Sequence, residues 1–155
     1  MDAKKIISGF QLVKAAVISL EVKNSFLEYD EHLNGSKTID VAYQITDSRT
    51  IEEKKIHGGS LDLHVTVASK INDSAYIIHM IYRGLFTAPS EMTFQEFSRM
   101  LKINGTASLY SMARAVLISI SSQMFSGGSI LLPMVNVIQF HELTESAVNN
   151  KESND

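Results

Sequence analysis

The sequence contains no cysteine in its 155 residues. A chain without thiols cannot form a disulfide framework, use a thiolate nucleophile or hold a metal through cysteine. The absence fits a reducing compartment. The charged start, Met1 to Lys5, is also not followed by the unbroken apolar segment of an export signal. We therefore expect a cytoplasmic protein.

Long apolar runs and an excess of basic residues are also lacking. The apolar stretches are interrupted well before the roughly 20 residues that a helix needs to cross a bilayer. The formal net charge is -3, which provides no broad basic surface for a phosphate backbone. These absences argue against membrane insertion and against nucleic acid as a partner.

What is present is the composition of a globular protein. Hydrophobic residues make up 45% of the chain and charged residues 20%. A chain of this length is enough for one compact domain with a core but too short for two. We assign residues 1–143 to a single domain. Residues 144–155 are polar, and we expect them to form a disordered tail.

Four segments have the two-residue period of a half-buried strand. The first is Phe10 to Tyr29, and a strong turn signal at Asn34-Gly35 separates it from the second, residues 39–45. The third is Leu61 to Val67 and the fourth is Tyr76 to Phe86. Short connections favour antiparallel neighbours. The pattern predicts a β-meander in which a hairpin joins the first two strands.

The period changes to about 3.6 residues after Pro89. This predicts a short helix from Thr93 to Leu101, a break at Gly105, and a long helix from about Thr106 to Phe125. A last apolar segment, Val135 to Leu143, predicts a short C-terminal helix. The fold class is therefore α+β: a four-stranded antiparallel sheet followed by a long helix and a short one.

The apolar stripe of the long helix is wider than one sheet requires. Leu117 and Ile118 extend it beyond the residues that a single sheet would cover. A second buried surface, formed between subunits, would account for the extra width. We therefore expect an oligomer.

The usual signatures of catalysis and metal binding are missing. No serine lies in a Gly-x-Ser-x-Gly turn, and Gly127-Gly128-Ser129 is better explained as a helix end than as a phosphate loop. Arg114 lies in an apolar helix, where a guanidinium needs carbonyl or carboxylate partners, so we expect a structural role. We expect no enzyme activity, no cofactor and no metal. The five histidines, which show no ligand spacing, are His32, His57, His64, His79 and His141.

Several short motifs, in order along the chain, resemble those of the bacterial export chaperone SecB. Gly84-Leu85-Phe86 is similar to the family's strand end, and Leu109-Tyr110-Ser111-Met112-Ala113-Arg114 to its helix-opening pattern, with serine where the family has proline. Leu132-Pro133 and Val135-Asn136 are similar to a further family stretch, and Phe10-Gln11 to the start of its first strand. The resemblance spans about residues 10–143.

The resemblance implies a fold and a function. Members of the family form a homotetramer, a dimer of dimers assembled through the sheets and the long helices. They are ATP-independent holdases that bind non-native polypeptides in long apolar grooves, for protein export. A holdase needs repeated weak burial of apolar surface, and flexible methionines suit varied clients. The client-binding residues that we expect are Tyr43, Ile45, Phe94, Phe97, Met100, Leu101, Met134, Val137 and Phe140.

One departure from the family concerns its acidic docking site for the basic tail of the motor SecA. Glu21 retains one acidic position, whereas Val17 and His79 occupy the others. These two residues cannot supply the same negative potential, which makes SecA a doubtful partner. The chain is then similar to the SecB-like chaperones of toxin-antitoxin systems, whose client is an antitoxin rather than a preprotein.

Two other classes of protein fit the same pattern. One is a small-ligand-binding or enzymatic α+β domain with an apolar cavity, for which only His64, His79 and Arg114 supply polar groups. The other is a structural assembly protein that has the fold but holds no clients. Client binding distinguishes these alternatives from a chaperone.

Overall fold

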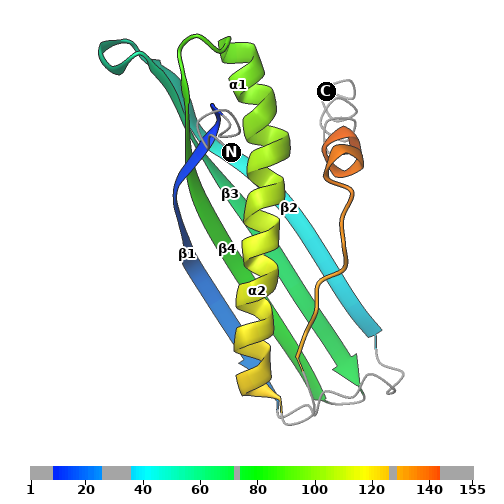
Figure 1. Cartoon of the computed structure of the whole chain (residues 1–155). Coiled ribbons are helices and arrows are strands. Elements are labelled where there is room, and N and C mark those ends of the chain that lie inside the picture. Colours follow the sequence, from blue (N-terminus) through cyan, green and yellow to red (C-terminus); the bar gives the residue numbers. More distant parts are fainter. Residues whose placement is uncertain (1–8, 26–35, 72–73, 126–128, 144–155) are drawn as a thin grey trace, which may run out of the picture.

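A four-stranded antiparallel sheet is covered on one face by a long helix and by a C-terminal segment (Figure 1). This computed structural model describes residues 9–25, 36–71, 74–125 and 129–143. The predicted α+β class, with four antiparallel strands, a long helix and a short C-terminal helix, is confirmed. The predicted tail, residues 144–155, lies outside the described residues.

The strands are not in the predicted order. They are β1 (Gln11–Asn24), β2 (Ser36–Ile51), β3 (Ile56–Ile71) and β4 (Ser74–Pro89), and their order across the sheet is β1-β4-β3-β2. Strands β2, β3 and β4 form a meander in which a 3₁₀ turn, η2 (Glu52–Lys54), joins β2 to β3.

The predicted hairpin between the first two strands is wrong, because β1 pairs with β4 and lies at the opposite edge from β2. The two edges are roughly 14 Å apart. Asn34-Gly35 signals a local tolerance of positive φ, and this tolerance does not specify which strands pair. The turn itself, and the predicted end of the first strand at Tyr29, lie outside the described residues.

The two central strands bury most of one face. Leu61, Leu63, Val65 and Val67 of β3 are at most 1% exposed. Cross-strand partners on β4 extend this surface, since Val65 lies opposite Met80, which is 1% exposed. The strict alternation of β3 predicted this face correctly.

Strand β1 departs from strict alternation. Its pairing with β4 shifts register between Leu12 and Lys14 and again between Val17 and Ser19. Such bulges leave a residue out of the ladder, and the residues left out here, Val13 and Ile18, are 63% and 48% exposed. The free edge of the sheet at β1 is therefore bulged and apolar.

The two predicted helices are one continuous helix. Helix α1 (Phe94–Met100) runs into a π-helical turn, η3 (Leu101–Gly105), and then into α2 (Thr106–Met124). It begins with a capping box, in which Thr93 Oγ1 accepts a hydrogen bond from the Glu96 backbone and the Glu96 carboxylate accepts one from the Thr93 backbone. Among the described residues no helix is long and apolar enough to cross a bilayer.

The predicted break at Gly105 is wrong because this glycine serves packing. Its backbone is helical, with φ -60° and ψ -50°, and a Cβ at this position would lie 3.4 Å from the Phe86 ring. The π turn includes Gly105 without ending the helix. As a result, the motif from Leu109 to Arg114, which resembles a helix opening, lies inside the helix.

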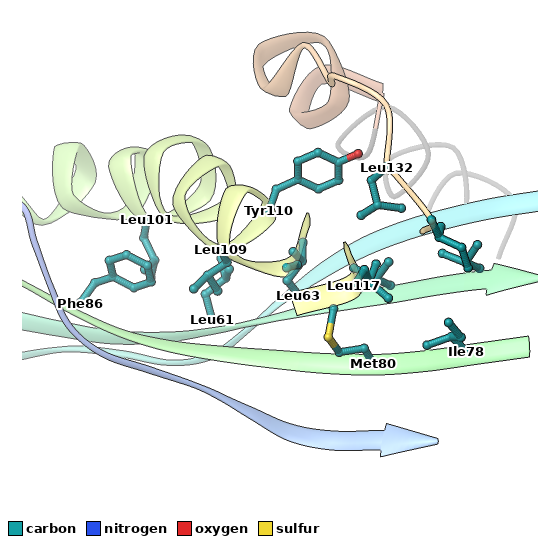
Figure 2. Close-up of a cluster of buried hydrophobic side chains, with 14 of the residues drawn as sticks. Leu61, Leu63, Ile78, Met80, Phe86, Leu101, Leu109, Tyr110, Leu117 and Leu132 are labelled. Carbon is teal, nitrogen blue, oxygen red and sulfur yellow. The ribbon is translucent and has the colours of Figure 1, made fainter. Parts of the chain in front are cut away.

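The helix packs on the sheet through large buried side chains (Figure 2). Phe86 stacks on Phe10 with ring centroids 5.2 Å apart. Leu109 is fully buried, and Gly84 leaves space for it in the centre of β4. The motif Gly84-Leu85-Phe86, predicted to end the fourth strand, instead lies inside β4, and Phe86 and Leu109 pack around its glycine.

Replacing Gly84 by alanine should lower the free energy of unfolding by about 2 kcal/mol, because the core has no room for another carbon. The added Cβ would lie 2.7 Å from the Phe86 ring and 2.8 Å from Leu109. Gly58→Ala is the control, since its Cβ would make an ordinary contact of 3.5 Å with Ile51. Chemical denaturation followed by circular dichroism measures both variants, and equal losses of stability would contradict this packing.

Candidate functional site

A strap, residues 129–135, runs along α2 and is fastened to it by hydrogen bonds. The Ile130 backbone N–H donates to Ser121 Oγ at 2.7 Å. Arg114 Nε donates to the Leu132 carbonyl at 3.0 Å, and the Tyr110 hydroxyl donates to the Pro133 carbonyl at 2.7 Å. Figure 2 shows Tyr110 reaching from α2 toward this segment. The helix motif from Leu109 to Arg114 and the Leu132-Pro133 motif, which both resemble SecB, are thus hydrogen-bonded to each other.

These bonds explain the roles of Tyr110 and Arg114 in the helix motif. The prediction that Arg114 needs a carbonyl partner is confirmed by its bond to Leu132. Burial raises the pKa of the Tyr110 phenol, and the nearby Arg114 guanidinium opposes part of that change. The phenol therefore stays protonated at neutral pH and remains a donor to the strap.

The C-terminal helix, residues 137–143, rests against the edge strand β2. The Tyr43 hydroxyl and His141 Nδ1 are 2.9 Å apart. The ring of Phe140 meets the Tyr43 ring edge to face, with centroids 5.8 Å apart. These contacts hold the C-terminal helix beside α1 (Figure 1).

A groove of about 530 Å³ lies between α1, η3 and the C-terminal helix. We call it the apolar groove. Its walls carry four apolar side chains, and its remaining lining residues are polar or charged. The apolar residues are Met92, Met100, Ile103 and Ile138, and the polar ones are Glu96, Arg99 and Asn104.

His57 positions one end of the apolar groove. It is buried, and its Nε2 lies 2.7 Å from the carbonyl oxygen of Met92, while its Nδ1 lies 2.9 Å from Thr50 Oγ1. Its ring also packs on Phe94 and Phe97. The sequence held no signal for this role, because the His57 contact to Met92 is set by tertiary packing.

The expected client-binding residues fall into three groups. Phe97 and Leu101 are fully buried beneath the helix and offer no surface in this conformation. Met100 lines the apolar groove, Met134 is 83% exposed and Phe94 is 42% exposed. The remaining residues, all half-buried on β2 or the C-terminal helix, are Tyr43, Ile45, Val137 and Phe140.

The sequence reasoning missed three apolar residues of the groove, Met92, Ile103 and Ile138. Ile103 follows Met100 by three positions, a helical spacing that indicates a shared face. Met92 and Ile138 had no comparable signal. They meet across the groove only because the chain returns to α1 after the strap.

The outer face of the sheet, away from the helix, carries paired charges. Glu21, the expected docking residue, lies 2.7 Å from Lys23, and hydrogen bonding and attraction to this lysine lower the pKa of Glu21. Asp62 is buried and accepts two hydrogen bonds from Arg83, at 2.6 and 2.7 Å. A base thus offsets each of these carboxylates.

The polar groups considered for a ligand cavity do not converge. Arg114 binds the strap, and His79 Nδ1 lies 3.0 Å from Thr66 Oγ1 on the exposed outer face. His64 is in β3, where it pairs with Ile81 on that same face. Within the described residues no group of three or more metal-ligating side chains is found.

A second hollow, of about 560 Å³, lies at the far end of the sheet. It is lined by both faces of the strand ends rather than by a helix. Tyr76 and Ile77 are the large apolar side chains among its described lining residues, whereas Lys23 and Lys70 are charged. It offers two large apolar side chains where the apolar groove has four, which makes it a weaker candidate for holding apolar ligands.

Comparison with known proteins identifies the fold. No protein-family model and no curated protein matches the sequence. The structure matches a Mycobacterium tuberculosis SecB-like chaperone solved in complex with a ChAD peptide from an antitoxin, with a TM-score of 0.60, 9% identity, and coverage of 82% of this chain and 91% of that one. A Streptococcus agalactiae protein of unknown function matches with a TM-score of 0.48, 14% identity, and coverage of 81% and 97%. The predicted resemblance to SecB is confirmed as a shared fold.

Replacing Tyr110 by phenylalanine should lower the free energy of unfolding by about 1 kcal/mol, because the Pro133 carbonyl loses its donor. Tyr82→Phe is the control, since Tyr82 is half-buried and no hydrogen bond of its hydroxyl is found among the described residues. Hydrogen exchange of the strap amides should also speed up in Tyr110→Phe only. Unchanged exchange and stability would show that the strap does not depend on this bond.

Proposed function

We propose that this chain, which has the SecB-like fold, is an ATP-independent holdase that keeps apolar segments of non-native polypeptides in the apolar groove. The observation that carries the proposal is the groove itself, open to solvent and walled by Met92, Met100, Ile103 and Ile138. Exposed apolar surface of this kind marks a binding site in a protein that must otherwise stay in solution.

The surroundings of the groove support a polypeptide rather than a small molecule as its occupant. Large apolar side chains continue beyond the groove along the strap and the C-terminal helix. A small ligand would be enclosed and held by convergent polar groups, whereas an extended chain gains from many modest contacts at about 25 cal/mol per Å². The exposed apolar residues of the strap and the C-terminal helix are Leu131, Met134, Ile138 and Leu143, and Phe94 is exposed on α1.

The nature of the client follows by analogy. The Mycobacterium tuberculosis chaperone with this fold binds a peptide from an antitoxin, which supports a polypeptide client here. We propose non-native chains in the cytoplasm, preproteins or an antitoxin, as clients. The pairing of Glu21 with Lys23 and of Asp62 with Arg83 argues against an acidic docking face for SecA, because matched charges cancel the attraction.

We also propose a homotetramer built as a dimer of dimers. Two apolar surfaces support it. The free edge at β1 carries Val13, Ile18 and Leu20, which are 63%, 48% and 42% exposed. The outer side of α2 carries Met112 and Ile118, each 37% exposed. Leu117 is fully buried within the chain, so Ile118 alone of the predicted pair is available to another subunit.

Ile138→Ser should weaken the binding of an unfolded polypeptide about tenfold, because the groove loses apolar area worth about 1 to 2 kcal/mol. Suppression of client aggregation, titrated against chaperone concentration, measures the effect. Leu85→Ser is the matched control, since Leu85 is 41% exposed on the outer face of β4, away from the groove. If wild-type protein leaves aggregation untouched, or if both variants weaken binding equally, the proposal fails.

Ile118→Lys should reduce the particle from about four chains to two, because a charge would be buried between dimers. Light scattering on the purified protein gives the mass directly. Leu85→Lys, a change of the same kind on the outer face, should leave the tetramer intact. A wild-type protein that is monomeric at all concentrations would contradict the assembly.

A further inference from the structure

Arg99 at the apolar groove has no ionic partner among the described residues. It lines the groove with an exposed side chain. Arg99 does not cap the end of a helix either. Helix α1 continues directly into η3, so the backbone carbonyls of the last turn of α1 remain inside a helix. A guanidinium has five N–H donors in a planar fork, and these are available to a bound molecule.

The one acidic side chain of the groove is already engaged. The Glu96 carboxylate accepts a hydrogen bond from the Thr93 backbone at 3.1 Å and another from the Thr93 hydroxyl at 2.9 Å. These two bonds lower the pKa of Glu96, so its charge is committed to the start of the helix. Within the described residues no ion pair joins Glu96 to Arg99, although they are three positions apart.

We propose that the apolar groove prefers client segments in which an acidic side chain lies next to apolar ones, and that Arg99 sets this preference. The inference rests on the proposed holdase function and names the clients of the same groove. Met92, Met100, Ile103 and Ile138 receive the apolar side chains, while Arg99 receives the carboxylate, with the amide of Asn104 beside it.

The local charge outweighs the charge of the whole chain. The net charge of -3 repels acidic segments at long range, but charges farther away than about 8 Å are largely screened at physiological ionic strength. Arg99 would touch the carboxylate directly, and arginine can bind a carboxylate through two parallel hydrogen bonds. An apolar wall on one side excludes water and strengthens that contact.

The test uses three fluorescent peptides with one apolar core, flanked by glutamate, glutamine or lysine. Binding to the full-length protein is measured by anisotropy for wild type, Arg99→Gln and Lys14→Gln. Lys14 is exposed on β1 and is not among the residues of the groove, so Lys14→Gln removes the same charge elsewhere. Circular dichroism and the elution volume establish that both variants fold and assemble.

We expect wild type to bind the glutamate peptide about threefold more tightly than the glutamine peptide, as one partly exposed ion pair allows. Arg99→Gln should lose this preference, and Lys14→Gln should keep it. Ionic strength near 1 M, where the screening length is about 3 Å, should weaken it. If wild type binds all three peptides equally, or if Lys14→Gln loses the preference as well, the inference falls while the holdase proposal stands. If no peptide binds, both fall.

Discussion

The width of the sheet, compared with the width of a helix, governs the rest of the structure. Four strands span roughly 14 Å between their outermost axes, and one helix with its side chains covers about 10 Å. The helix contacts β3 and β4, whose inward side chains from Leu61 to Val67 and from Tyr76 to Met80 are at most 2% exposed. The inward side chains of the two edge strands are left incompletely covered.

The two edges differ in what covers them. At β2 the chain returns as the strap and the C-terminal helix, and Tyr43 meets Phe140 there. This second layer is narrow, and the apolar groove is the space that remains between it and α1. At β1 no described segment returns, and Leu20 and Val22 stay 42% and 36% exposed. We propose that the apolar groove beside β2 receives a client and that the exposed edge at β1 contacts another subunit.

Sequence patterns predicted what depends on local periodicity. The alternation of β3, the existence of the long helix and the need of Arg114 for a carbonyl partner are each visible in single segments. Strand order and the continuity of the helix were mispredicted, because Asn34-Gly35 and Gly105 report local backbone freedom and not tertiary packing. Half of the groove was also out of reach, since Met92 and Ile138 come together only when the strap is bound to α2.

The central claim, that apolar polypeptide segments bind in the apolar groove, is most directly tested by methyl NMR. Methionine and isoleucine methyl groups of the full-length protein would be labelled, and their signals followed during titration with an unfolded polypeptide. The account predicts that Met100, Ile103 and Ile138 shift, while Met80 in the core and Ile81 on the outer face do not. Shifts confined to the outer face, or none at any groove methyl at saturation, would contradict it.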